Sequence, residues 1–384
     1  MRQISLFGAT GTIGDNALDL IARHKDKFSL FAASADGNVD KLADIARRYN
    51  PSLLVIGDEA GRVSLREALP GFNGDILVGA EGLAQMARAK VDLAIMAIVG
   101  FAGLAPSLIY TSQGGVLALA NKEALVAGGA HLMEVANEND TQILPVDSEH
   151  NAIFQLLQGQ GDEEQIDKIV LTASGGPFRD MSLEDMRDVT PTQAVAHPNW
   201  DMGAKISVDS ATMMNKGLEL IEAHHLFAIT PNKLDALIHP QSIVHGLVYF
   251  ADGSVLAQKA SPDMRVPLAY CMAYPNRIDA GVAPLDLAAQ GRLDFAAVDR
   301  AQFPCLALAE AAMRAGGHES ARLNAANEVA VAAFLQKRIG FLQIADTVEA
   351  VLEKDSHEGG SGVEALHAID AEARAQAQAF IETI

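Results

Sequence analysis

The chain has 384 residues, of which 49% are apolar, and a formal net charge of -20. That length predicts two or three domains, each with a hydrophobic core of its own. The acidic balance argues against nucleic acid as a partner, because such binding depends on Lys and Arg that neutralise phosphates, but it leaves room for a small anionic substrate.

Six short apolar runs alternate with helical patterns between residue 1 and residue 147, at residues 4–7, 30–33, 53–56, 93–97, 116–118 and 143–146. This alternation predicts strand-helix-strand units and a Rossmann-like parallel sheet, hence an α/β fold class. The longest apolar tract, residues 93–105, is too short to span a bilayer, so no membrane association is expected.

The pattern changes after Asn151. Residues 169–172, 243–250 and 255–259 are predicted strands, and the last two form an antiparallel hairpin through residues 251–254. We therefore predict a central α+β domain with a mixed or antiparallel sheet at 148–275, and a proline-punctuated linker at 276–298. A C-terminal helical bundle follows at 299–384, with helices at 306–313, 321–335 and 363–384 and a glycine-rich loop at 359–362.

Only two cysteines occur, Cys271 and Cys305. They offer neither a disulfide framework nor a thiolate metal cluster, and a reducing cytoplasm is the simplest expectation. A single structural disulfide is the alternative. The first residues enter a strand-like run without the pattern of a signal peptide.

Gly8, Gly11 and Gly14 follow the first predicted strand and open a predicted helix that reaches Arg23. Glycines at this spacing let the backbone turn tightly and approach a pyrophosphate, whose charge the helix N-terminus favours. An ordinary tight turn is the alternative for the spacing alone. Its position at the start of an alternating α/β domain favours a dinucleotide site.

An acidic residue about 20 positions after the glycines usually binds the ribose of NAD, whereas a basic residue accommodates the extra phosphate of NADP. Asp36 stands at about that place, before Gly37 and Asn38. It points to NADH, although a solvated turn residue is an equally good interpretation.

Asp147, Ser148 and Glu149 leave a predicted strand and enter a predicted helix. Ligands bind at strand ends in α/β sheets, and carboxylates are the ligands that Mg²⁺ and Mn²⁺ prefer, so these residues are candidates for a metal site. The alternative is that Asp147 or Ser148 only caps the helix, which leaves Glu149 unexplained.

A second polar segment is predicted to contain a helix at 212–227 capped by Asp209 or Ser210. Asn215 and Glu219 would share one face of that helix, with Lys216 beside them, so that one helix presents a phosphate-binding group and a metal ligand. The alternative is an ordinary exposed pair between Lys216 and Glu219.

Ser174 begins a glycine turn that could bind an anion through its hydroxyl and backbone amides, with a plain turn as the alternative. His197 and the only tryptophan, Trp200, lie in a proline-containing segment at about 179–205 that suits a lid excluding water. Trp200 as a core residue and His197 as a structural histidine are the alternatives.

Several motifs cover nearly the whole chain in order: GATGTIG (8–14), ANKE (120–123), PVDSEHNAIF (145–154), SGGPF (174–178), HPNW (197–200), residues 205–219, HPQS (239–242) and LNAANE (323–328). Together these pieces resemble the 1-deoxy-D-xylulose 5-phosphate reductoisomerases. The resemblance implies metal-dependent rearrangement of 1-deoxy-D-xylulose 5-phosphate and NADPH reduction to 2-C-methyl-D-erythritol 4-phosphate, in the non-mevalonate route to isoprenoid precursors.

The resemblance also implies roles for single residues. The implied metal ligands, for Mg²⁺, Mn²⁺ or Co²⁺, are Asp147, Glu149 and Glu219, and the implied phosphate ligands are Ser174, His197, Ser210, Asn215 and Lys216. Ser148 and Lys122 would bind the substrate's other oxygens, and Trp200 and Met202 would belong to the lid. The implied cofactor residues are Thr10, Gly11, Thr12, Ile13, Asn38, Asn121, Glu123 and Gly203. A homodimer built on the central domain is implied as well.

A metal that polarises adjacent oxygens assists either a retro-aldol and re-addition or a direct ketol shift, because both develop oxyanion charge. Two rival interpretations are a dehydrogenase without isomerisation, related to semialdehyde or homoserine dehydrogenases, and a nucleotide-sensing regulatory module whose metal site is vestigial. Many relatives carry a basic or small residue where this chain has Asp36 and Gly37, so we predict NADPH with relaxed discrimination against NADH.

Overall fold

The computed structural model describes the chain except residues 160–162, 197–199, 201–202 and 355–361. The chain forms two compact units. Unit 1 contains Met1–Ala124, His131–Asn151 and Asp263–Ala283, and unit 2 contains Leu125–Ala130, Ala152–Pro262 and Pro284–Ile384. The functional domain boundaries predicted from the sequence stay predictions.

Unit 1 is built on a seven-stranded parallel sheet with the order β4-β3-β2-β1-β5-β6-β7. Its strands are β1 (Arg2–Phe7), β2 (Phe28–Ser34), β3 (Leu53–Ile56), β4 (Asp75–Val78), β5 (Leu93–Met96), β6 (Gly115–Leu119) and β7 (Thr141–Pro145). The predicted Rossmann-like parallel sheet is confirmed. β4 is an additional edge strand of four residues that the sequence analysis missed, and Ile76 is its one buried residue.

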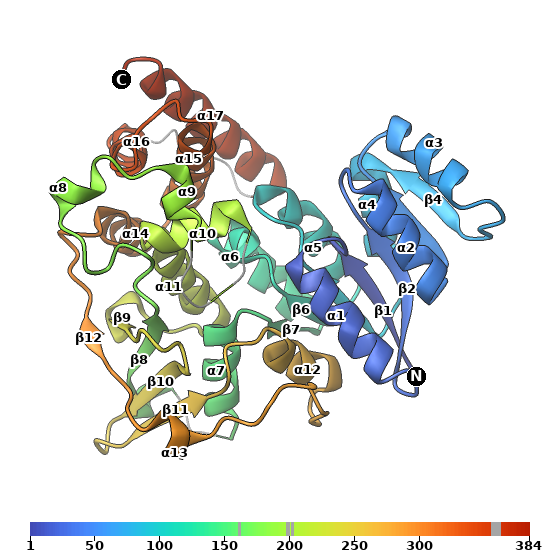
Figure 1. The fold of residues 1–384 in the computed structure, drawn as a ribbon, viewed down its shortest axis with the longest axis horizontal. Helices are drawn as coiled ribbons and strands as arrows, with labels where there is room; N and C mark the ends of the chain where they lie inside the picture. Colours follow the sequence, from blue (N-terminus) through green and yellow to red (C-terminus); the bar gives the residue numbers. More distant parts are fainter. Residues whose placement is uncertain (160–162, 197–199, 201–202, 355–361) are drawn as a thin grey trace. The chain divides into compact units, whose positions relative to one another are not determined.

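Helices connect these strands, as the alternating pattern predicted (Figure 1). They are α1 (Thr12–Arg23), α2 (Val39–Tyr49), α3 (Glu59–Ala68), α4 (Gly79–Arg88), the 3-10 turn η1 (Phe101–Gly103), α5 (Leu104–Thr111) and α6 (Lys122–Glu138), which is kinked at Gly128. One later segment joins this unit: α12 (Arg265–Ala273) packs against α1, β6 and β7. Pro267 fits there because a proline is tolerated in the first turn of a helix.

Unit 2 contains a five-stranded mixed sheet with the order β11-β10-β8-β9-β12. Its strands are β8 (Ile166–Ala173), β9 (Leu234–Ile238), β10 (Val244–Phe250), β11 (Val255–Lys259) and β12 (Ala296–Ala297). The predicted antiparallel hairpin of β10 and β11 is confirmed, and β8 pairs in parallel with β9. β12, at the end of the predicted linker, was missed because two exposed alanines carry no strand signal without their partner β9.

The remaining helices belong to unit 2 or lead into it. They are α7 (Ser148–Leu157), η2 (Glu163–Gln165), α8 (Leu183–Met186), α9 (Pro191–Ala194), α10 (Ala204–Ala211), α11 (Met214–Phe227), η3 (Pro231–Lys233), α13 (Leu287–Gln290), α14 (Pro304–Ala315), α15 (Glu319–Leu335), α16 (Gln343–Leu352) and α17 (Val363–Ile381). The last four pack against one another, which confirms the predicted C-terminal helical region. α16 was not predicted, and most of the predicted loop at 359–362 lies outside the described residues.

Cys271 and Cys305 are both free and buried, so the single-disulfide alternative is wrong. Each lies on the packed face of a helix, α12 or α14, where a thiol behaves as a small apolar side chain. Among the described residues, no helix is long and apolar enough to cross a membrane.

Candidate active site

The glycine fingerprint forms a tight turn between β1 and α1. Gly8 has a φ of +79°, and a Cβ there would lie 2.5 Å from the carbonyl oxygen of Ala97. A Cβ on Gly14 would lie 2.2 Å from the carbonyl oxygen of Ala9. Both contacts are with backbone, which has little freedom to move, so these positions require glycine.

The start of α1 suits a pyrophosphate. Gly11 is the N-cap residue and supplies no side-chain cap to the first amides of the helix, while Gly11 and Thr12 are exposed. Uncapped amides at a helix N-terminus attract anions. The predicted cofactor residues Thr10 and Gly11 therefore lie in the turn, and Thr12 and Ile13 begin α1, an arrangement that fits a dinucleotide.

The junction of β2 and α2 carries Asp36, Gly37 and Asn38, all exposed. The Asn38 side chain caps α2 by accepting a hydrogen bond from the Lys41 amide at 3.1 Å. The Asp36 carbonyl accepts one from the Gly57 amide at 2.8 Å. A Cβ on Gly57 would lie 2.6 Å from Asp36 Oδ1, so this carboxylate lies against the turn after β3.

Asn121, a predicted cofactor residue, has a structural side chain. Its Oδ1 accepts from the Ala124 amide at 2.9 Å and so caps α6, and its Nδ2 donates to the carbonyl oxygens of Ile98 at 2.6 Å and Gly100 at 2.9 Å. A further bond of 3.2 Å joins it to the buried carboxylate of Glu123. The side chain thus ties the loop after β5 to the start of α6.

Lys122 and Asp147 form a buried ion pair at the carboxyl ends of β6 and β7, with side chains 7% and 16% exposed. Burial alone would raise the pKa of the Asp147 carboxyl, but the charges of Lys122 and His150, together with hydrogen bonding to Lys122 and Glu149, lower it well below its usual range. Asp147 is therefore ionised at neutral pH, the form that binds a cation.

Ser148 and Glu149 begin α7 directly after Asp147. The Ser148 hydroxyl donates to Glu149 Oε2 at 2.5 Å. The alternative that Asp147 or Ser148 acts only as a helix cap does not account for the paired Asp147 carboxylate or for the bond between Ser148 and Glu149.

A buried clamp that the sequence analysis missed holds this turn. Asn151 Nδ2 donates to the Pro145 carbonyl oxygen at 2.9 Å, and the Cys271 thiol donates to the same oxygen at 3.2 Å. Asn151 Nδ2 also lies 3.4 Å from Cys271 Sγ. Pro145 precedes Asp147 by two residues, so the clamp fixes the backbone that presents Asp147.

α11 carries three predicted site residues within about one helical turn, namely Asn215, Lys216 and Glu219. The Asn215 amide donates to Glu219 Oε1, and the Lys216 ammonium donates to Glu219 Oε2. The Lys216 and Glu219 side chains are only 2% and 1% exposed, so the alternative of an exposed surface pair is wrong. A buried ion pair is costly to desolvate and seldom adds net stability, which favours a functional reason for it.

The turn that begins at Ser174 packs against α10, which carries Ser210. Gly176, in the turn of Ser174, packs so closely on α10 that a Cβ would lie 2.7 Å from the Ser210 carbonyl oxygen. The Gly176 amide donates to Ser174 Oγ at 3.1 Å, which is the turn geometry expected from the sequence. Asn215 and Lys216 follow in the first turn of α11.

The predicted cap of this helix is wrong. α11 begins after Met213, which has a left-handed φ of 60° and provides no side-chain cap. Asp209 and Ser210 instead belong to a separate helix, α10. Asp209 is 1% exposed and pairs with Lys205 at 2.8 Å, while it accepts from Asn327 of α15 at 2.8 Å.

The predicted lid is described only in part, since His197 and Met202 lie outside the described residues. Trp200 is partly buried, and its ring meets that of His245 in β10 edge-on, with centroids 6.4 Å apart. Gly203 is exposed and begins α10 as its N-cap residue. Trp200 as a lid residue and as a core residue both fit this contact.

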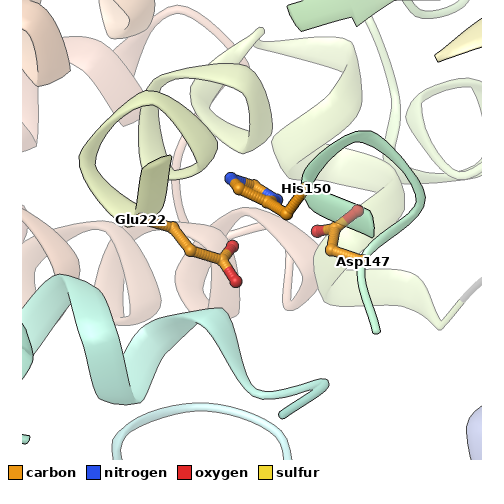
Figure 2. A group of neighbouring side chains, drawn as sticks. All are labelled: Asp147, His150 and Glu222. Carbon is orange, nitrogen blue, oxygen red and sulfur yellow. The ribbon is translucent and has the colours of Figure 1, made fainter. Parts of the chain in front are cut away.

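Two sets of side chains in the described part of the chain have the ligand types that a metal ion binds: Asp147, Glu149 and Glu219, and Asp147, His150 and Glu222. Figure 2 shows the second set, in which Asp147 directly precedes α7, His150 lies in the first turn of α7 and Glu222 belongs to α11. The first set consists of carboxylates alone, and oxygen ligands suit Mg²⁺ and Mn²⁺.

Models of one protein family match most of the chain. The model described as 1-deoxy-D-xylulose 5-phosphate reductoisomerase matches residues 4–129. Two models described as C-terminal domains of that enzyme match residues 143–227 and 260–376.

Curated relatives and solved structures indicate the same family. A 1-deoxy-D-xylulose 5-phosphate reductoisomerase of Aromatoleum aromaticum is 50% identical over 100% of this chain and 96% of its own length, and that of Ralstonia pickettii is 50% identical over 100% and 98%. The Zymomonas mobilis enzyme in complex with NADPH has a TM-score of 0.93 at 46% identity and covers both chains fully. A reductoisomerase in complex with NADPH, fosmidomycin and magnesium has a TM-score of 0.95 at 41% identity, covering 100% of this chain and 98% of its own.

Proposed function

The chain belongs to the 1-deoxy-D-xylulose 5-phosphate reductoisomerase family, and we propose that the polar residues described above form its active site. It is an NADPH-dependent oxidoreductase that rearranges 1-deoxy-D-xylulose 5-phosphate and reduces it to 2-C-methyl-D-erythritol 4-phosphate with a divalent metal ion. This places it in isoprenoid precursor biosynthesis. The observation that carries the assignment is the full-length match to enzymes of this name, and family membership removes the two rival interpretations.

Asp147, Glu149 and Glu219 bind the metal ion in this proposal. Support comes from the donor set, which contains only carboxylates, and from the Lys122 ammonium that keeps Asp147 ionised. Bound there, Mg²⁺, Mn²⁺ or Co²⁺ would act as a Lewis acid on substrate oxygens. Asn215 and Lys216 orient the Glu219 carboxylate by donating to both of its oxygens.

Ser174, Ser210, Asn215, Lys216 and His197 bind the substrate phosphate. Two observations support this set: the Ser174 turn packs on the backbone of Ser210 in α10, and the Lys216 ammonium is buried in the first turn of α11. Charge-assisted hydrogen bonds of this kind hold phosphate strongly. Ser148 and Lys122 bind the remaining oxygens, and the Lys122 ammonium stabilises negative charge that develops on them.

The cofactor lies along the fingerprint loop, with Thr10, Gly11, Thr12, Ile13, Asn38, Asn121, Glu123 and Gly203 as its proposed neighbours. Support comes from the required glycines, the uncapped start of α1 and the exposed Asn38. Asn121 contributes through its backbone, since its side chain is already bonded within the protein. Trp200 and the lid shield the intermediate from water.

We also propose the functional division made from the sequence: residues 1–147 for NADPH, 148–275 for catalysis and dimerisation, 276–298 as a linker, and 299–384 as a helical domain. β11 supports the homodimer, because it is an edge strand on which Val255 and Leu256 are 44% and 40% exposed. Two free thiols fit a reducing cytoplasm.

A direct experiment follows the nicotinamide absorbance of NADPH with purified protein, 1-deoxy-D-xylulose 5-phosphate and Mg²⁺, with and without a chelator. We expect oxidation that stops on chelation and resumes with excess Mg²⁺ or Mn²⁺. Glu149→Gln should bind NADPH normally and lose turnover, because it removes a ligand charge. Turnover that persists in the chelated protein or in Glu149→Gln would refute the metal assignment.

A further inference from the structure

The choice between NADPH and NADH depends on the phosphate that only NADPH carries on its adenosine ribose. In a Rossmann-like fold this phosphate lies past the carboxyl end of β2, where a basic side chain usually receives it. In this chain the connection after β2 reads Ala35, Asp36, Gly37 and Asn38, which offers no cation. Because the family uses NADPH, the positive charge that binds this phosphate has to come from another residue of this protein.

Lys41 places an ammonium at this position. Lys41 lies in the first turn of α2, and its backbone amide donates a hydrogen bond to the side chain of the N-cap residue Asn38. Its Nζ donates to the carbonyl oxygen of Thr10 in the fingerprint loop at 2.9 Å and to Asp15 Oδ2 at 2.7 Å. Lys41 thus reaches across from α2 to the loop that approaches the cofactor.

The neighbouring charges single out Lys41. Arg47 and Arg48 stand in the last turn of α2, and Arg23 in the last turn of α1, away from the fingerprint loop. Lys27 precedes β2 and so belongs to the amino end of that strand. Lys41 is the one basic residue in the first turns of α1 and α2.

The pair of Lys41 and Asp15 leaves the ammonium available. The side chains of Lys41 and Asp15 are 34% and 55% exposed, and ion pairs at such exposure contribute little stability. An ammonium has three N–H donors, and within the described part of the chain Thr10 and Asp15 accept from two of them. A phosphate can bind the third and compete with Asp15 for the second.

We propose that Lys41 binds the 2′-phosphate of NADPH and supplies the preference for NADPH that this chain retains despite Asp36. Asp15 opposes this preference, since its carboxylate competes for the ammonium and repels the phosphate. The assignment rests on the proposed function, because it concerns the same cofactor site. It adds a residue that determines cofactor selectivity.

Binding of NADPH and NADH tests this without turnover. Nicotinamide fluorescence is titrated with the metal-free protein in the absence of substrate, and the ratio of the two dissociation constants is compared among variants. Lys41→Gln should weaken NADPH about tenfold while changing NADH less than about twofold, since one charge-assisted hydrogen bond is lost. Lys41→Arg should keep most of the ratio, and Asp15→Asn should tighten NADPH about threefold.

The same comparison with 2′,5′-adenosine bisphosphate and 5′-AMP locates the effect on the 2′-phosphate. Arg47→Gln, which removes one positive charge at the far end of the same helix, is the matched control and should leave both constants unchanged. Equal losses for NADPH and NADH in Lys41→Gln would overturn the proposal, because they would mean that Lys41 only supports the loop through Thr10. An unchanged ratio in either Lys41→Gln or Asp15→Asn would also overturn it.

Failure of the proposed function gives a different result. If the wild-type protein bound neither NADPH nor NADH, the cofactor assignment of the whole chain would be wrong. If it bound NADPH more tightly and Lys41→Gln kept that preference, the assignment of Lys41 alone would be wrong.

Discussion

His225 makes the stability of unit 2 depend on pH in a defined direction. It lies in the last turn of α11, with its ring packed on α6 so closely that a Cβ on Gly129 would lie 2.3 Å from its Cδ2. Burial, followed by the charge of His224, lowers the pKa of His225 from 6.5 to about 4. The folded protein therefore keeps this imidazole neutral where the unfolded chain protonates it.

The sign follows from proton binding. Between pH 6.5 and about pH 4 the unfolded state binds one proton more than the folded state, so stability falls as the pH falls. The contribution is fully present above pH 6.5 and lost below pH 4. The difference between the two pKa values corresponds to about 3 kcal/mol in all, of which about 2 kcal/mol is lost by pH 5.

The assay is urea-induced unfolding followed by circular dichroism in steps from pH 8 to pH 5. His225→Gln cannot titrate, so its loss of stability over this range should be smaller than that of the wild type by about 2 kcal/mol. His367→Gln, which changes an exposed histidine of α17, should follow the wild type. Parallel curves for the wild type and His225→Gln would refute the reasoning.

Four further predictions concern the site. Gly14→Ala should abolish NADPH binding and lower the Tm, at a cost of more than about 2 kcal/mol, because the added Cβ would lie 2.2 Å from a backbone oxygen. The control is Gly37→Ala, whose Cβ would meet nothing within 4 Å, and equal Tm values for the two variants would contradict this prediction. Asn151→Ala should destabilise by about 1–3 kcal/mol and lower kcat while the Kd for NADPH stays constant; wild-type turnover would count against the clamp on Pro145. Glu219→Gln should lower the Tm of the metal-free protein by the equivalent of about 3 kcal/mol, because it breaks the buried ion pair with Lys216, and replacing Lys216 with Met and Glu219 with Leu together should restore it; a single variant as stable as the wild type would contradict this cost. Asp36→Asn should raise the NADPH to NADH ratio of kcat/KM, and a wild-type preference for NADPH of several orders of magnitude would contradict relaxed discrimination.

Local patterns were sufficient to predict most of the fold. Buried strands such as β3 and β5 are continuous apolar runs, and the hairpin of β10 and β11 has a turn sequence between two predicted strands. The elements that were missed depend on their surroundings. β12 consists of two exposed alanines that count as a strand only because β9 pairs with them.

The candidate site was also predictable from local patterns only in part. Asp147, Glu149, Lys216 and Glu219 stand at strand ends and helix starts, which a sequence shows through its motifs. The clamp on Pro145 includes a residue from a distant position, Cys271, which lies 126 residues further along the chain. No local pattern reports such a contact, and the same holds for the bond between Lys41 and Thr10.

The burial of the Lys216 and Glu219 pair could have been read from its neighbours. Gly217, Leu218 and Leu220 interleave with the charged residues, and such a helix has no continuous polar face to expose. The failure of the Asp209 cap has a different cause. A left-handed Met213 separates α10 from α11, and this break depends on packing that helix periodicity does not reveal.

The proton NMR spectrum of the product tests the central claim most directly. The protein is supplied with 1-deoxy-D-xylulose 5-phosphate, NADPH and Mg²⁺, and the methyl signal of the product is recorded. A methyl singlet is predicted, because rearrangement places that group on a carbon without hydrogen, as in 2-C-methyl-D-erythritol 4-phosphate. A methyl doublet from an unbranched reduced product would show reduction without rearrangement and would contradict the account.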